Sequence, residues 1–226
     1  MKRCSNRSTL LAPLTFALSL VASSAFAEPT TTLDEVPTSL RVGPSGQPLD
    51  EAQTKRLLEG KVICSLTPGQ GDDAPKGVAV AIIDAAPAQV FKTLRDYPHF
   101  KEYMPHVTSA TVDSTTGAQS LVSVRVHGAM GLGDREYQLR VSDEKKTVEG
   151  HEVLVSRFEY TGKGNIKASK GEWTLVPFAG GTKTFATFMD HLDPGGSIPR
   201  HLKNHEVQKG MEDAMEAVQQ HTLAKN

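Results

Sequence analysis

This chain of 226 residues contains only two cysteines and one tryptophan, and its positive and negative charges are almost equal in number. So few cysteines exclude the disulfide framework on which many small secreted scaffolds depend. The 25 Lys and Arg residues are matched by 26 Asp and Glu residues, which gives a formal net charge of −1. This balance argues against the basic surface of nucleic-acid-binding proteins, so no nucleic-acid partner is expected.

A long apolar run is missing as well. The stretch from Leu10 to Val21 is shorter than the roughly 20 residues of a membrane span, and Pro13 interrupts it. It lies between a basic start and the small-residue site Ala25-Phe26-Ala27, a pattern typical of a secretory signal peptide. We therefore expect a signal peptide over residues 1–27 and a periplasmic or secreted protein. No cysteine stands at the cleavage point itself, so a lipid anchor is not expected.

Residues 28–48 form a second segment of distinct composition. They are rich in proline and threonine and contain few large apolar side chains. Such a segment buries too little apolar surface to offset the entropy lost on ordering, so we expect a flexible leader. The remaining residues, 49–226, have the length of one ordinary domain.

Short elements separated by turns follow residue 48. Asp50 is suited to cap a short helix that Gly60 ends, and prolines bound two further short helices after the second strand. From residue 107 on, apolar residues recur at every second position, which is the period of strands with one buried face. The expected strands cover residues 61–66, 77–83, 107–113, 121–126, 136–141, 148–160, 168–176 and 182–189.

An amphipathic helix is expected at the end of the chain, over about 197–223. Ile198, Leu202 and Met211 belong to its single apolar stripe. An antiparallel sheet that buries one face needs a cover, and this helix is the available one. A helix about 10 Å in diameter does not fill the hollow of a curved sheet, so we expect an apolar cavity between the two.

Several motifs, taken in order, resemble those of a known family. They are VAIIDAAPAQVFKTLRDYPHFKEYMP at 80–105, GDREY at 133–137, GEWTLVP at 171–177, GGTK at 180–183 and DPGGSIPRHLKN at 193–204. The chain is similar to the START-like domains of the helix-grip superfamily, which also holds polyketide cyclases and coenzyme-Q-binding proteins. The resemblance implies an α+β fold, in which a curved antiparallel sheet of about seven strands wraps around a long C-terminal helix, with two short helices after the first core strand.

The same resemblance implies a START-like ligand-binding domain over 49–226 that binds, and carries, a hydrophobic small molecule such as a lipid, fatty acid or sterol. Arg125, Arg135 and His201 are candidates for contact with a ligand headgroup. His201 stands where many relatives have an aromatic residue, usually Trp, so the polarity of the tunnel mouth is expected to differ. The residues expected to line the cavity are Tyr103, Met104, Val124, Met130, Leu132, Tyr137, Leu139, Trp173, Phe185, Ile198, Leu202 and Met211.

Some of these residues have a second interpretation that the sequence leaves open. Met130 and Leu132 either touch a ligand or a membrane from a loop, or pack back onto the sheet. Trp173 and Met211 are also consistent with ordinary core packing. Arg135 either meets a headgroup or forms a structural ion pair at the end of a strand.

An enzyme is the alternative function. The chain has no Gly-x-Ser-x-Gly nucleophile elbow and no Gly-rich phosphate loop that opens a helix, and Cys64 lies in an apolar run as a small buried hydrophobe. The remaining catalytic hypothesis is a cyclase- or aromatase-like enzyme acting on an enclosed hydrophobic substrate. Its polar groups would come from Tyr103, Arg125, His127 and Glu136.

Metals and cofactors are not expected. His201 and His205 share a helix face, but a zinc site needs a third ligand, and no His-Glu-x-x-His pattern is present. A third hypothesis is a protein-interaction module that uses the outside of the sheet, which predicts an exposed apolar patch. The expected partners are therefore the hydrophobic ligand and, transiently, a membrane, with the protein itself a monomer.

Overall fold

The computed structural model describes residues 32–69, 74–128, 133–196 and 199–225, which belong to one structural unit. The signal peptide expected over residues 1–27 lies outside these ranges. Within them, no helix combines the length and the apolar character that crossing a membrane requires.

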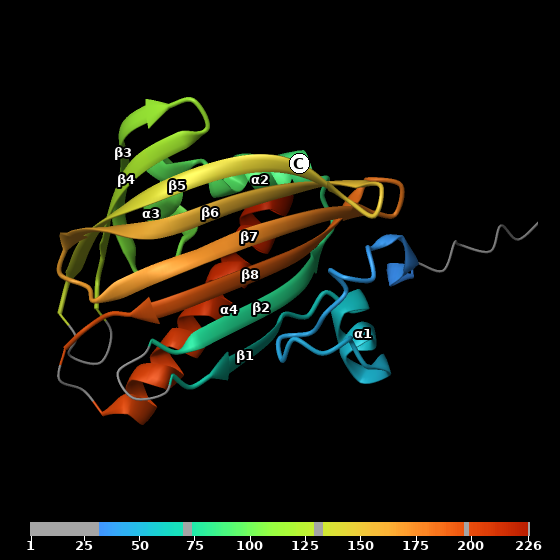
Figure 1. Ribbon diagram of the computed structural model, residues 1–226, viewed down its shortest axis with the longest axis horizontal. Coiled ribbons are helices and arrows are strands. Elements are labelled where there is room, and N and C mark those ends of the chain that lie inside the picture. Colours follow the sequence, from blue (N-terminus) through green and yellow to red (C-terminus); the bar gives the residue numbers. More distant parts are fainter. Residues whose placement is uncertain (1–31, 70–73, 129–132, 197–198, 226) are drawn as a thin grey trace, which may run out of the picture. The chain divides into compact units, whose positions relative to one another are not determined.

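One antiparallel sheet of eight strands dominates this part of the chain (Figure 1). The strands are β1 (Ile63–Thr67), β2 (Lys76–Ile83), β3 (Val107–Thr116), β4 (Gln119–Val126), β5 (Arg135–Val148), β6 (His151–Gly164), β7 (Ala168–Phe178) and β8 (Lys183–Asp193). Their order across the sheet is β1-β2-β8-β7-β6-β5-β4-β3. β3 to β8 thus form a meander, and β2 pairs with β8 from Lys76 opposite His191 to Ile83 opposite Thr184.

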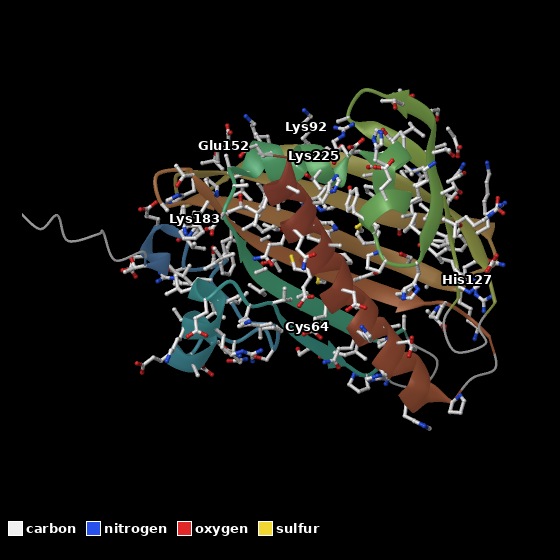
Figure 2. All side chains as sticks on the ribbon, turned by 180° about the vertical axis from the view of Figure 1, so that it is seen from behind. Cys64, Lys92, His127, Glu152, Lys183 and Lys225 are labelled. Carbon is white, nitrogen blue, oxygen red and sulfur yellow. The ribbon has the colours of Figure 1, made fainter. Side chains whose placement is uncertain are left out.

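The long helix α4 (Arg200–Ala224) lies across one face of this sheet, behind it in Figure 1 and in front of it in Figure 2. Val207, Met211, Met215 and Val218 recur every three to four positions along α4 and are all buried, as expected for one helix face. The helix contacts β1, β2 and β8. The expected helix-grip fold is confirmed, with eight strands instead of about seven.

Three short helices lie on the same face beside α4. They are α2 (Pro87–Leu94), η2 (Tyr97–His99) and α3 (Phe100–Tyr103), which follow β2 where the sequence predicted two short helices. The end of α4 is tied to them, because the hydroxyls of Thr222 and Thr93 hydrogen-bond at 3.0 Å. Lys225 Nζ also donates to Asp96 Oδ2 at 2.8 Å, and Figure 2 shows Lys225 beside Lys92 of α2.

Side chains that alternate along the strands form two separate buried clusters. On the inner face, which we define as the face toward α4, Trp173 and Phe188 belong to a cluster with Met211. On the opposite, outer face, Phe178 and Phe185 belong to a second cluster. Because successive side chains of a strand point to opposite faces, Phe185 and Phe188 of β8 lie on different sides of the sheet.

The N-terminal segment covers the outer cluster. η1 (Leu33–Glu35) and α1 (Glu51–Leu58) contribute the buried side chains of Leu33 and Leu57, and Val36 is only 1% exposed. The structure thus corrects the expected flexible leader over 28–48, as far as its residues are described. The composition of the segment is polar on average, but a few apolar side chains anchor it because they fill gaps over the outer cluster.

Hydrogen bonds hold this segment as well. The backbone N–H groups of Thr38 and Ser39 donate to the carboxylate of Glu149, at 2.9 and 3.2 Å. α1 begins with a capping box, in which Asp50 Oδ1 accepts from Gln53 N at 2.7 Å and Gln53 Oε1 accepts from Asp50 N at 3.2 Å. The short helix capped by Asp50 is therefore confirmed.

Candidate functional site

A pocket of about 170 Å³ lies between the inner face of the sheet and the short helices, and we call it the inner pocket. Its walls are mostly apolar and aromatic, with a few polar groups, which is the usual composition of a site for a small hydrophobic molecule. The lining residues are Leu94, Tyr97, Phe100, Met104, Val107, Val124, Tyr137, Leu139, Val141, Ser156, Phe158, Ser169, Trp173, Phe188, Asp190 and Leu192.

The inner pocket differs in position from the expected cavity between sheet and C-terminal helix. No α4 side chain that the structure describes is among its lining residues. The reason is that α4 packs closely on β1, β2 and β8, away from the strands that line most of the pocket. A Cβ atom added at Gly77 of β2 would lie 2.0 Å from Met211 Sδ, so that methionine fills the space beneath the helix.

Stacked aromatic rings form one wall of the inner pocket. The rings of Trp173 and Phe188 are nearly parallel, 8° apart, with centroids 4.3 Å apart, and Phe158 lies 6.2 Å from Phe188. Trp173 is also part of the inner cluster. Trp173 is therefore both a core residue and part of the pocket wall. A flat wall of this kind suits rings or extended chains, which gain from close contact.

Asp190 on β8 is the acidic residue of the inner pocket. Its side chain is buried, with 7% exposure, and its Oδ1 atom has no hydrogen-bond partner among the described residues. Burial raises the pKa of the Asp190 carboxyl to about 8, although the backbone of His191 and Lys170 acts in the opposite direction through hydrogen bonds. The carboxyl is therefore mostly protonated at neutral pH and can donate a hydrogen bond.

Glycines on both neighbouring strands surround Asp190. Gly77 of β2 and Gly171 of β7 are its register partners. A Cβ atom at Gly171 would lie 2.5 Å from Phe158 Cζ and 2.1 Å from the carbonyl oxygen of Met189. The missing side chains let neighbouring rings and chains close over the strands beside the acid. Asp190 is therefore the only one of these three register partners whose side chain reaches into the pocket.

Tyr137 on β5 supplies a second polar group. Burial raises the pKa of its hydroxyl, and negative charge on Asp190 raises it further. The hydroxyl therefore stays protonated and can donate as well as accept a hydrogen bond. Ser156 and Ser169 complete the polar part of the lining.

The structure brings together five of the twelve residues that the sequence assigned to the cavity: Met104, Val124, Tyr137, Leu139 and Trp173 all line the inner pocket. Met130, Leu132 and Ile198 lie outside the described residues, and the Leu202 side chain is outside them too.

The other three predicted lining residues lie elsewhere. Tyr103 donates its hydroxyl to the carbonyl oxygen of Thr93 at 2.8 Å and stacks on His221 with ring centroids 3.8 Å apart. Phe185 belongs to the outer cluster, because its position on β8 has the opposite parity to Phe188. Met211 packs over β2. Each makes contacts that hold the fold rather than the pocket.

The three candidate headgroup residues lie outside the inner pocket. Arg125 is exposed and donates from Nη2 to Glu136 Oε2 at 2.8 Å. Arg135 donates from Nε to the carbonyl oxygen of Pro194 at 2.8 Å, so its partner is a backbone carbonyl and not the acid of the expected ion pair. His201 is exposed.

The proposed set of catalytic polar residues is not assembled around the inner pocket. His127 pairs with Asp134 at 2.8 Å on the surface, and Figure 2 shows it at the opposite end of the sheet from Lys183. Within the described ranges, no cluster of three or more His, Cys, Asp or Glu residues could hold a metal ion. Burial raises the pKa of the Cys64 thiol to about 11, so it stays protonated and unreactive at neutral pH.

Two larger hollows lie on the outer face, and neither suits an apolar ligand. One, of about 670 Å³, is lined largely by charged side chains, among which Arg157 pairs with Glu144 and Glu172. The other, of about 250 Å³, lies against the N-terminal segment and mixes Lys76 and Glu172 with apolar residues. Charged walls keep bound water, so a hydrophobic molecule gains less there than in the inner pocket.

Asp190 and Phe188 are pocket residues that the sequence analysis missed. The expected strand ended at residue 189, whereas β8 continues to Asp193. With the longer strand, the alternation that places Ala186 and Phe188 inside also places Asp190 inside. The signal in the sequence was an acidic residue at the next position of the buried, every-second-residue pattern of β8.

Comparison with known proteins agrees with this geometry. The profile of the family described as polyketide cyclase/dehydrase and lipid transport matches residues 75–226, well over half of the chain. The chain belongs to this family. Members of the polyketide cyclase/dehydrase and lipid transport family share the fold described above, and the matched region contains every residue of the inner pocket. No curated protein sequence matches the chain.

Solved structures of similar fold include lipid-transfer proteins and a cyclase. The STAR-related lipid transfer protein of Xanthomonas axonopodis is 25% identical, with a TM-score of 0.62 over 71% of this chain and 93% of that chain. Human StAR-related lipid transfer protein 5 is 14% identical, with a TM-score of 0.61 over 71% and 81%. The Zhui aromatase/cyclase of Streptomyces sp. R1128 is 11% identical, with a TM-score of 0.52 over 65% and 92%. The last two likenesses establish the fold alone.

Proposed function

We propose that this protein binds a hydrophobic small molecule, such as a lipid, fatty acid or sterol, in the inner pocket and carries it shielded from water. The observation that supports this most directly is the aromatic and aliphatic lining, interrupted by only a few polar groups. Burial of apolar ligand surface is favourable by roughly 25 cal/mol per Å², so such walls suffice to hold a ligand. The lipid-transfer name of the similar Xanthomonas axonopodis structure points the same way.

A place of action outside the cytoplasm is part of this proposal. It rests on the signal-peptide pattern of residues 1–27, with its basic start and its Ala25-Phe26-Ala27 site. A carrier in the periplasm or outside the cell would collect its ligand from a membrane and would need only transient contact with it.

The binding proposal is tested on the purified protein. Native mass spectrometry and organic extraction should reveal a co-purifying apolar molecule, and Val124→Phe should reduce its amount because Val124 lines the inner pocket. Val112→Phe is the matched control, since Val112 is 43% exposed on the neighbouring strand β3. A protein that stays empty and binds no member of a broad lipid panel would contradict the proposal.

A cyclase-like enzyme is the second candidate, and Asp190 is the observation that favours it. A carboxyl with a pKa of about 8 in an apolar pocket is suited to general acid chemistry near neutral pH. Among the described lining residues, however, there is no Lys, Arg or His to share the work. Turnover of a poly-carbonyl substrate that is abolished in Asp190→Asn would favour the enzyme over the carrier.

A further inference from the structure

We propose that the inner pocket selects uncharged ligands that carry a hydroxyl or carbonyl group, and that this group docks between Asp190 and Tyr137. This inference rests on the proposed binding function and adds to it the chemical class of the ligand. It is carried by three observations: where Asp190 lies, which of its atoms lacks a partner, and which charges the lining does not contain.

The position of Asp190 is the first observation. It lies on the inner face of β8, between Gly77 and Gly171 on the two neighbouring strands. It lines a pocket whose other walls are mostly hydrocarbon and aromatic. An acid at this place weakens the core unless something satisfies it, because polar groups are costly to bury without partners.

The unpartnered oxygen is the second observation. Asp190 is only 7% exposed, and its Oδ1 atom makes no hydrogen bond to any residue that the structure describes. Tyr137 on β5 lines the same inner pocket and supplies a second polar group. A ligand hydroxyl or carbonyl oxygen placed between them would accept from one group and, if a hydroxyl, donate to the other.

The missing counter-charge is the third observation. Among the described lining residues there is no Lys, Arg or His, so an anionic ligand would enter without a partner for its charge. A cationic ligand would require Asp190 to ionise, which burial opposes. A neutral ligand avoids both penalties. The same argument separates fatty alcohols, sterols and acyl esters from ionised fatty acids.

The test compares probes that share one hydrocarbon chain and differ in the polar end. Decanol, decanoate, decyl ammonium and decane are titrated against the full chain by calorimetry or by displacement of a fluorescent apolar dye. We expect decanol to bind about tenfold or more tightly than either charged probe, because desolvation of an unpaired charge is expensive.

Variants then assign the preference to residues. Asp190→Leu should weaken decanol binding by about 3–10-fold, the value of one net hydrogen bond, and should leave decane binding unchanged. Tyr137→Phe should have a smaller effect of the same sign. Tyr103→Phe is the matched control, because the Tyr103 hydroxyl bonds to Thr93 instead of facing the pocket. Asp190→Asn should retain decanol binding, since its amide both donates and accepts.

The outcomes separate this inference from the function on which it rests. Tightest binding of decanoate or decyl ammonium overturns the inference and leaves the binding function intact. Unchanged decanol binding in Asp190→Leu and Tyr137→Phe does the same. If Asp190→Leu does not fold, Tyr137→Phe and its control Tyr103→Phe decide. If no probe binds to the wild-type protein, the proposed function fails, and the inference fails with it.

Discussion

The two faces of the sheet are formed by the same strands, but one face is packed and the other borders a pocket. On the outer face, Phe178 and Phe185 pack beneath η1 and α1 and are almost completely buried. On the inner face, Phe188 and Trp173 stack on one another and leave a pocket beside them. The outer cluster surrounds its two phenylalanines with valine, leucine and isoleucine side chains. On the inner face Phe158 closes over Gly171, and the inner pocket lies between the sheet and the short helices.

Truncating one phenylalanine on each face of β8 is expected to give the largest effect. Phe185→Ala should lower the free energy of unfolding by about 3–5 kcal/mol, because it opens a cavity in a filled core. Phe188→Ala should cost less, because one side of this ring already borders the inner pocket. Urea denaturation of both variants measures the difference.

The same pair of variants separates stability from binding. Phe188→Ala enlarges the inner pocket and should shift binding toward bulkier ligands, whereas Phe185→Ala should leave the ligand range unchanged. Equal losses of stability together with equal changes in ligand range would contradict the division of the sheet into a packed face and a binding face.

Removing the charge of Asp190 should change stability in a pH-dependent way. Below about pH 3 the carboxyl is mostly protonated in the folded and the unfolded chain, so Asp190→Asn and wild type should be similarly stable. As the pH rises toward the folded pKa of about 8, the unfolded chain releases this proton and the folded chain keeps it. Wild type should therefore lose a few kcal/mol relative to the variant, with the loss complete above about pH 8.

Denaturation curves of both proteins across this pH range measure the loss, and all other titrating groups cancel in the comparison. A stability difference that stays constant with pH would mean that the Asp190 carboxyl ionises normally. The inner pocket would then be far more polar than its lining suggests.

Adding a methyl group at Gly171 tests the close packing beside the acid. Gly171→Ala should cost about 2–3 kcal/mol, because the new Cβ would meet backbone atoms of β8 as well as the Phe158 ring. Gly210→Ala on α4 is the control. It has open space around its Cβ position, and alanine favours helix, so it should stabilise the protein by about 0.5–1 kcal/mol. Thermal unfolding in one assay distinguishes the opposite signs.

Loss of the helix cap on the outer cover should give the smallest effect. Asp50→Ala removes the acceptor of the Gln53 N–H and should cost about 1 kcal/mol, while Asp50→Ser keeps a capping oxygen and should cost little. Ligand binding should be unchanged in both, because α1 lies over the outer cluster. Reduced binding in Asp50→Ala would show that the two faces are coupled.

Most of the fold could be predicted because its signals are local. The alternation of β3 to β8, the apolar stripe of α4 and the cap at Asp50 each depend on residues close together in the sequence. The N-terminal segment was predicted wrongly because Leu33 and Val36 find their partners far along the chain, in the outer cluster. The average composition of a segment does not reveal that two of its apolar side chains are buried against distant residues.

The site was less predictable, because the face on which a side chain lies depends on its exact position in the strand and on where the strand ends. Phe185 was assigned to the cavity, although it stands three residues from Phe188 and therefore on the opposite face. Asp190 was overlooked because the expected strand stopped one residue before it. Tyr103 was assigned to the cavity, but its ring stacks on His221, which lies far along the chain on α4. Such distant pairings leave no periodic trace in the sequence.

The pairing of β2 with β8 also constrains how the chain is completed on the ribosome. β2 is synthesised long before its neighbour β8, and in the finished sheet β8 alone joins β1 and β2 to the meander of β3 to β7. Until β8 emerges, the backbone groups along β2 are open to any other extended chain. A truncated chain that ends before β8 therefore exposes an unpaired strand edge, so premature termination favours aggregation. Nascent chains at this stage are expected to need chaperones.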